Sequence, residues 1–357
     1  MKTRHWMTAG SLAITSATSA CAQQGNLQIQ GVLDVYMNYA KSGEKKLYRV
    51  EDGGAAASRV TFRGSEDLGG GLRAGFWLEA GVAPDTGQGT MPGPGLSFAR
   101  QSFVSLSSSQ LGSIELGRMY TPMFNALLRS DPLNVNTLFS SVNLIAATDS
   151  QPNMRAFAAR ASNMVRYRTA PQSKWIVDVA YAFGEVASPH SDNGNTVGAN
   201  VGWKEKAWEV SYSFQQTAAG TSAAPVSHPF KTRWHALSGN WTPMHTLQLY
   251  ANYILGTVNA PGTPDAQTLE FAARWQVGQA STVIASMAQR KVDHSDNKQF
   301  TYTLGYDYAL SNRTSLYARW LQLNNSHRSA VSLANVPVDA ASGNNVSSLG
   351  LGIRHFF

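Results

Sequence analysis

The last eleven residues of the chain alternate between apolar and small or polar side chains, and the chain ends on an aromatic residue. In a β-strand, successive side chains point to opposite faces. One face of this strand would carry the apolar side chains, namely Leu349, Leu351, Ile353 and Phe357. The other face would carry Ser348, Gly350 and Arg354. A strand of this kind fits a sheet that has apolar surroundings on one side and water on the other.

The same period of two residues recurs along the chain, in 27–39, 174–183, 208–215, 246–255 and 300–308. Many of these segments run for about ten residues, the length of a tilted membrane-spanning strand. A soluble β-sandwich also alternates, but its strands are usually about five or six residues long. Aromatic residues near segment ends on the apolar face also favour a membrane barrel: Trp175, Phe183, Trp208, Trp241, Trp275 and Trp320.

Composition excludes a helical membrane protein. No stretch approaches the roughly 18 apolar residues that a membrane-spanning helix needs. Only 14% of residues are charged, and the mean hydropathy is −0.23. Strands that alternate between apolar and polar residues average to such a mild value, so a transmembrane β-barrel remains compatible with it.

The N-terminus, residues 1–22, is typical of a secretory signal peptide. Lys2 and Arg4 precede a weakly apolar stretch, and Ala20-Cys21-Ala22 fits a cleavage site that would leave Gln23 as the first mature residue. Lipidation of Cys21 is the alternative, although Thr18 stands where such signals usually carry leucine. Cleavage after Ala22 would leave residues 23–357 as one domain without cysteine, and would lower the formal charge from +7 to +5.

Connections between the expected strands alternate between short turns and longer polar stretches. The short ones carry Gly, Pro, Asn and Asp, which turns select. The longer ones are 41–55, 84–97, 120–158, 185–196, 217–230, 257–266, 291–298 and 325–344. This spacing predicts an all-β, antiparallel up-and-down transmembrane barrel of about 16 strands. A barrel of that size is too wide for its side chains to fill, so it encloses an aqueous channel.

Five segments, taken together and in order, resemble the Gram-negative general porins, especially the trimeric porins of β-proteobacteria. They are 58–72, 98–106, 116–122, 163–167 and 350–357. The resemblance implies a homotrimer of 16-stranded barrels in the cell outer membrane, reached by export through the periplasm. It also implies that the third long loop, 120–158, folds into the barrel, and that the second, 84–97, reaches a neighbouring subunit. The Pro-Glu-Phe-Gly-Gly element of many enterobacterial porins is absent.

Strand parity predicts which charged residues face the channel. If the apolar residues of each strand face lipid, the inward set is Arg59, Arg63, Arg73, Glu79, Arg160, Arg166 and Arg168. Arg100 stands at a wall position that is basic in the family that the chain resembles. Arg118 shares the parity of the apolar Ile114 and Leu116, so we expect a bulge or a strand end there, because a charge facing lipid at mid-membrane costs about 2–4 kcal/mol.

The inward arginines would gather on one wall, opposite the nearest loop acids, Asp131 and Asp149. Guanidinium groups stay charged at physiological pH, so this arrangement would create a transverse field and a weak preference for anions. The alternative is that these arginines are ordinary solvated groups with no role in selectivity.

The predicted function is passive diffusion of small hydrophilic solutes and ions, without catalysis. A barrel enzyme and an adhesin are the rivals, but no nucleophile elbow, phosphate-binding glycine loop or ordered site at the rim is apparent. No histidines have metal-pair spacing, and nothing indicates a cofactor. The basic residues are spread rather than clustered, which argues against nucleic acid. Loop cations would instead contact lipopolysaccharide and other outer-membrane lipids.

Overall fold

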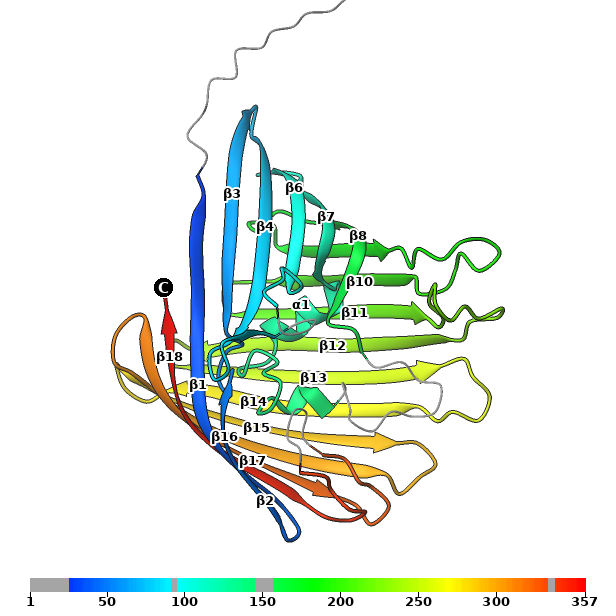
Figure 1. Ribbon diagram of the computed structural model, residues 1–357. Helices are drawn as coiled ribbons and strands as arrows, with labels where there is room; N and C mark the ends of the chain where they lie inside the picture. The colour runs from blue at the N-terminus through cyan, green and yellow to red at the C-terminus, as the bar shows by residue number, and fades with distance from the viewer. Residues whose placement is uncertain (1–25, 91–94, 145–156, 333–337) are drawn as a thin grey trace, which may run out of the picture.

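The computed structural model describes residues 26–90, 95–144, 157–332 and 338–357, and most of them form one closed β-sheet (Figure 1). The strands are β1 (Gln28–Ser42), β2 (Lys45–Asp52), β3 (Arg59–Gly69), β4 (Leu72–Ala83), β5 (Gln88–Gly89), β6 (Gln101–Ser108), β7 (Gly112–Tyr120), β8 (Arg160–Arg168), β9 (Trp175–Ala182), β10 (Thr196–Lys204), β11 (Trp208–Ala218), β12 (Lys231–Met244), β13 (Leu247–Val258), β14 (Ala266–Gln276), β15 (Ser281–Val292), β16 (Lys298–Ala309), β17 (Thr314–Asn325) and β18 (Val346–Phe356). The helices are α1 (Pro122–Arg129) and the short 3-10 helix η1 (Ser141–Leu144).

The barrel wall has sixteen strand positions, as the sequence predicts, although the described residues contain eighteen separate strands. One edge of β1 pairs with β2 over 35–42 and with β3 over 28–32. β2 and β3 therefore share one position in the barrel wall, as a single strand interrupted by residues 53–58. β5 pairs only with the end of β4 and belongs to a loop. The remaining neighbours are all antiparallel, and pairing of β1 with β18 closes the ring. Among the described residues, β2 pairs with a strand only along its β1 edge.

Pairing of β1 with β18 closes the ring, and the final residue completes this ladder. The register runs from Val32 opposite Phe356 to Ser42 opposite Val346. Beyond it, Phe357 and Gly31 exchange both backbone hydrogen bonds, with N–O distances of 3.0 and 3.1 Å. A Cβ atom at Gly31 would lie 2.4 Å from the Phe357 ring. The aromatic C-terminus is therefore seated on a glycine at the closing seam.

The two faces of the sheet agree with the predicted parity. The outward set is exposed, including Leu349, Leu351, Ile353 and Phe357 in the last strand, whereas Ser348 is 1% exposed. The inner face is less polar than strict alternation predicts, because Trp234, Ile254 and Leu321 point inward and are buried. These residues pack against the chain segment that enters the barrel.

The prediction of a long loop over 41–55 is wrong for most of these residues, because they form the end of β1 and all of β2. β1 continues to Ser42 and β2 starts at Lys45, with a tight turn in which Gly43 has a φ of 56°. Both strands extend here through a polar sequence. Backbone pairing with β1 is enough to form a strand, so no apolar face is required and the periodicity signal disappears.

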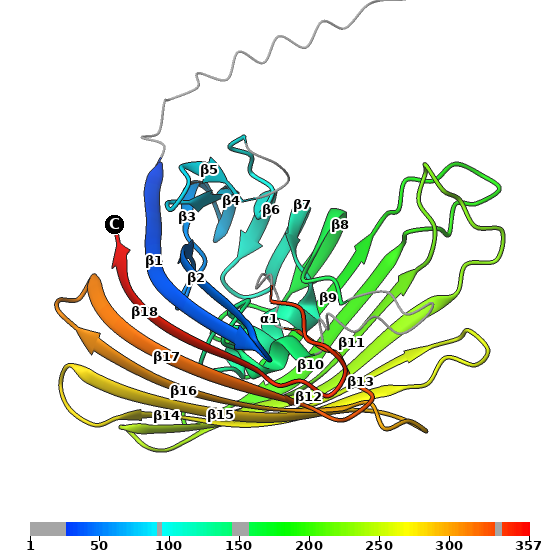
Figure 2. The same ribbon diagram turned by 60° about the horizontal axis from the view of Figure 1, so that its bottom comes forward.

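The segment between β7 and β8 folds into the barrel, as expected for the loop 120–158. Figure 2 shows α1 within the curve of the sheet, and α1 contacts β9, β10, β11 and β12. Thr121 caps the helix by accepting a hydrogen bond from the Phe124 backbone nitrogen, and Pro122 occupies the first turn. Met123 and Leu127 form its buried face.

Hydrogen bonds fasten this inward segment to the opposite wall. The Ser130 hydroxyl donates to Asn252 Oδ1 at 2.7 Å, and Asn252 Nδ2 donates to the Ser130 carbonyl at 2.8 Å. Thr303 Oγ1 donates to the Phe139 carbonyl at 2.8 Å. The Phe139 ring is fully buried and meets Tyr36 edge-on. The segment is thus fastened to β13 through Ser130 and to β16 and β1 through Phe139.

No helix in the described ranges is long and apolar enough to cross a membrane. The expected signal peptide, 1–22, lies outside the described residues, as does the tip of the loop 84–97.

We predict that Phe139→Ala loosens the inward segment without opening the barrel. Loss of a buried phenylalanine costs about 3–5 kcal/mol, because the cavity left behind is only partly refilled. Hydrogen exchange should rise for amides in 122–144 and stay unchanged in β1 and β18. Leu111→Ala, at an exposed turn, is the matched control. Equal protection in wild type and variant would contradict the docking role of Phe139.

Candidate functional site: the channel cavities

A cavity of about 890 Å³ lies inside the ring, between the inward segment and the wall formed by β1 to β6. Arg59, Glu79, Arg100 and Arg160 line it. Strand parity predicts that Arg59, Glu79 and Arg160 face inward, and the family resemblance predicts the same for Arg100, which directly precedes β6. The cavity therefore unites part of the predicted basic wall.

Glu79 is the centre of this wall. Its carboxylate is buried and lies 2.7 Å from Arg100 Nε and 3.8 Å from Arg59 Nε. Trp77 Nε1 also donates to Glu79 Oε2 at 3.4 Å. Because one carboxylate is shared by two guanidinium groups, it fixes both and neutralises only one positive charge.

Tyr120 links the wall to a third arginine. Its hydroxyl oxygen accepts from Arg100 Nη2 at 2.7 Å and from Arg160 Nη2 at 2.8 Å. The Arg160 guanidinium also lies 4.4 Å from the centroid of the Tyr120 ring, a cation–π distance. Among the described residues, no carboxylate forms an ion pair with Arg160, and its Nε has no hydrogen-bond partner. Arg160 is therefore one of two arginines of the cavity, with Arg354, that form no ion pair among the described residues.

A second cavity, of about 790 Å³, contains three more of the predicted arginines: Arg63, Arg73 and Arg168. Arg63 donates to Gln28 Oε1 at 2.9 Å, and Arg73 lies 3.9 Å from Asp67. Trp77 is the one residue that lines both cavities. Its ring thus stands where the two spaces adjoin.

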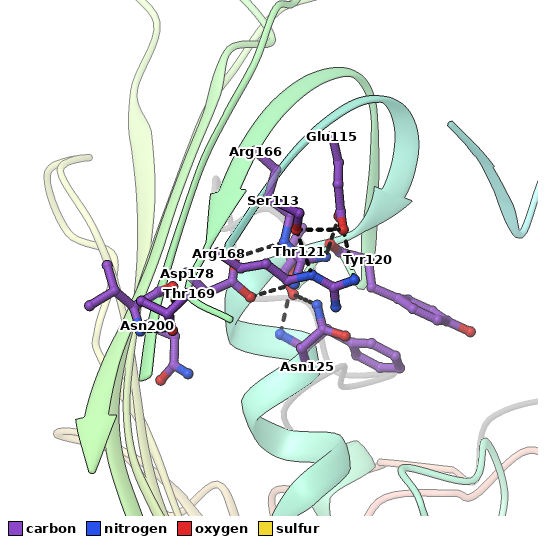
Figure 3. Close-up of polar contacts among 12 residues, drawn as sticks. Ser113, Glu115, Tyr120, Thr121, Asn125, Arg166, Arg168, Thr169, Asp178 and Asn200 are labelled. Carbon is purple, nitrogen blue, oxygen red and sulfur yellow. Dashed lines mark hydrogen bonds and ion pairs between the residues drawn. The ribbon is translucent and has the colours of Figure 1, made fainter. Parts of the chain in front are cut away.

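Arg166 serves a different purpose from the cavity arginines. Figure 3 shows it among Glu115, Asp178 and Tyr120, where β7, β8 and β9 meet. Its Nε donates to Asp178 Oδ1 at 2.7 Å, and Nη1 lies 3.6 Å from Glu115 Oε2. Arg168 binds the other oxygen of Glu115 at 2.7 Å. Arg166 is 5% exposed, and its charge is compensated by Glu115 and Asp178. Neither cavity includes Arg166 among its lining residues.

Arg118 occupies the irregularity that its parity predicts. The β7–β8 register shifts between Gly117 and Met119, and Gly117 has a φ of 140°. Arg118 Nε donates to the Ala99 carbonyl at 2.6 Å, and Nη1 donates to Ser162 Oγ at 2.9 Å. Neither cavity includes Arg118 among its lining residues. Its guanidinium therefore donates hydrogen bonds to residues beside the bulge and does not line either described cavity.

The loop side of the larger cavity presents amides. Asn134, Asn136 and Asn143 line it. Asp131 is buried and turned into the loop, where its carboxylate accepts from Ser140 Oγ and from the Val135 nitrogen, both at 2.6 Å. Burial raises the pKa of this carboxyl above its ordinary value. Asp149 lies outside the described residues. The described loop thus gives the cavity no carboxylate opposite the basic wall.

Several lining residues were missed by parity alone. Tyr120, Phe124 and Phe157 are inward aromatics, and residues 53–58 form a second inward element. Thr121 and Pro122 before an apolar run were the signal for the helix that carries Phe124. No group of three His, Cys, Asp or Glu side chains in the described ranges could hold a metal ion.

Comparisons with known proteins agree with this geometry. The family model of the Gram-negative porin matches residues 8–328. The chain belongs to the Gram-negative porin family. It is 30% identical to outer membrane porin protein 32 of Delftia acidovorans, over 97% of this chain and 98% of that protein.

Two solved structures share the fold of this porin. An anion-selective porin from Comamonas acidovorans superposes with a TM-score of 0.80 at 24% identity, over 94% of this chain and 100% of that one. The trimer form of the Vibrio cholerae outer membrane protein OmpT gives 0.67 at 14% identity, over 93% and 99%. The chain is an outer-membrane diffusion channel of the porin type.

We predict that Glu79→Gln increases the preference for anions. The variant removes the carboxylate that Arg59 and Arg100 share, so the cavity gains one positive charge. A unit charge at about 4 Å in water contributes about 1 kcal/mol, or about a fivefold change in permeability ratio. The reversal potential in a KCl gradient measures this ratio.

Glu205→Gln, in an exposed turn, makes the same change in net charge outside the cavity and should leave the ratio unchanged. A shift of equal size in both variants would contradict a local role for Glu79.

Proposed function

We propose that this porin is a trimeric, passive and non-catalytic channel for small hydrophilic solutes, with a weak preference for anions. The carrying observation is the charge of the larger cavity. Five arginines line it, namely Arg49, Arg59, Arg100, Arg160 and Arg354, against three carboxylates, Glu51, Asp52 and Glu79. Guanidinium groups cannot lose this charge at physiological pH. Among the described residues, this excess of two positive charges would attract anions into the larger cavity.

The selectivity residues in this proposal are Arg59, Arg100 and Arg160. They line one cavity, and Tyr120 and Glu79 hold them close together. In the second cavity, Arg63 would add positive potential, whereas Asp67 and Glu115 offset the charges of Arg73 and Arg168. The anion-selective porin from Comamonas acidovorans has the same fold, which is compatible with a preference for anions in this chain.

The assembly and its surroundings complete the proposal. A trimer would place three channels side by side, with the loop 84–97 reaching a neighbouring subunit. Exposed loop cations such as Lys45 and Arg328 would contact lipopolysaccharide phosphates. Removal of residues 1–22 would start the mature chain at Gln23.

We predict that the double variant Arg59→Ser, Arg100→Ser shifts selectivity toward cations. It removes two positive charges and leaves the buried Glu79 carboxylate without an ion-pair partner. The chloride-to-potassium permeability ratio, measured from single-channel reversal potentials, should fall at least about fivefold.

Arg313→Ser, in the exposed β16–β17 turn, is the control and should behave as wild type. An unchanged ratio in the double variant would remove the wall assignment.

We predict that mass spectrometry of the outer-membrane protein finds three copies per native assembly. Each denatured chain should have the mass of residues 23–357. A monomeric native mass would contradict the trimer. A chain with a lipid on Cys21 would contradict cleavage after Ala22.

A further inference from the structure

The apolar part of the larger cavity adjoins Arg160, which forms no ion pair among the described residues. Phe124, Leu128 and Phe157 line the cavity together with Arg160. The Phe124 ring stacks on Tyr120 at a centroid distance of 4.8 Å, and Phe157 lies 6.4 Å from Phe124 at an interplanar angle of 30°. Trp234 meets the Phe157 ring edge-on at 6.2 Å. The rings of Tyr120, Phe124 and Phe157 thus form an aromatic surface beside Arg160, and Trp234 supports it from behind Phe157.

General diffusion does not require such a surface. Water and small ions gain nothing from an aromatic lining, because burial of apolar area only rewards an apolar solute. A flat aromatic ring does gain, since offset and edge-on ring contacts are favourable. The neighbouring cation adds the second requirement, which is a negative charge on the same molecule.

The hydrogen-bonding groups around Arg160 match a carboxylate. Its Nε is a buried donor without a partner in the described structure, so the protein leaves part of the guanidinium's hydrogen-bonding capacity unused. The Tyr120 hydroxyl accepts from two guanidinium groups, and none of its hydrogen bonds in the described residues uses its own hydrogen. A hydroxyl supplies one donor and two acceptor positions, so this hydrogen is available to an incoming anion. Guanidinium and phenol donors together suit the two oxygens of a carboxylate.

We propose that the cavity contains a binding subsite for aryl carboxylates. Arg160 and the Tyr120 hydroxyl would bind the carboxylate, and Phe124 and Phe157 would contact the aromatic ring. The subsite rests on the proposed anion channel and narrows its substrate class. Binding occurs without any covalent step, and the solute leaves again through the channel.

Benzoate and cyclohexanecarboxylate are the probes. Each has one carboxylate on a six-membered carbon ring, but only benzoate is flat and aromatic. Each is added to one side of a bilayer that holds the assembled wild-type porin in symmetric KCl, and the reduction of single-channel current is measured. We expect benzoate to reduce the current at a concentration about threefold to tenfold lower, the range for one aromatic contact.

Two variants separate the ring contact from the charge. Phe157→Leu keeps an apolar side chain and should abolish the difference between the two probes. Arg160→Gln should weaken the effect of both probes. Phe183→Leu, an exposed outward aromatic, is the matched control and should retain the wild-type difference.

Equal effects of the two probes on the wild-type channel would overturn the subsite, and this comparison needs no variant to fold. A Phe157→Leu channel that keeps the full difference would also overturn it. The reversal potential in KCl alone tests the proposed anion channel independently. A channel that prefers chloride and treats both probes alike would therefore lose only the subsite.

Discussion

The structure depends on pairing of every backbone group around a closed sheet. Within the apolar layer of the membrane, no water is present to satisfy a free N–H or C=O group of a strand. The membrane-spanning part of each strand must therefore pair with a neighbour on both sides. The interruption between β2 and β3 shows how strict this requirement is. The nitrogens of Gly54, Ala55 and Ala56 leave the ladder, and the buried Asp34 carboxylate accepts from all three at 2.8 to 3.0 Å. One side chain thus replaces a stretch of strand.

This replacement also shapes the channel. Residues 53–58 point into the lumen because Asp34 holds their nitrogens, and they reach the inward segment, where Asn136 Nδ2 donates to the Gly53 carbonyl. Arg59 follows directly, and its Nη1 donates to the Ala57 carbonyl at 2.8 Å. The basic wall and the loop that faces it are therefore connected through backbone geometry.

Sequence periodicity predicts the barrel well and its contents poorly, for a physical reason. Lipid and water select the two faces of every strand, so residues such as Leu349 and Ser348 reveal their orientation by type. Inside the ring no single solvent acts. Trp234 and Ile254 point inward because the inward segment covers them, and nothing in their own strands records that contact.

The charged residues of the site show the same limit of sequence-based prediction, because parity does not reveal their ion-pair partners. Parity turns Glu79 inward but cannot show that two arginines share its carboxylate. Asp131 has the composition of a channel acid, yet Ser140 and two backbone nitrogens enclose it within the loop. Arg166 has the parity of a channel cation, yet Glu115 and Asp178 neutralise it.

Net charge along the channel consequently depends on pairing more than on residue count. A paired guanidinium contributes little potential to a passing ion, because its partner's opposite charge lies within about 3–4 Å and the field of the pair falls off quickly. The effective cations are those with a shared partner or none. In the larger cavity these are Arg59 and Arg100, which share Glu79, and Arg160, which has only the Tyr120 ring and hydroxyl. Arg354 joins them, because it forms no ion pair among the described residues. We therefore propose that selectivity is concentrated beside the aromatic surface, at Arg59, Arg100 and Arg160.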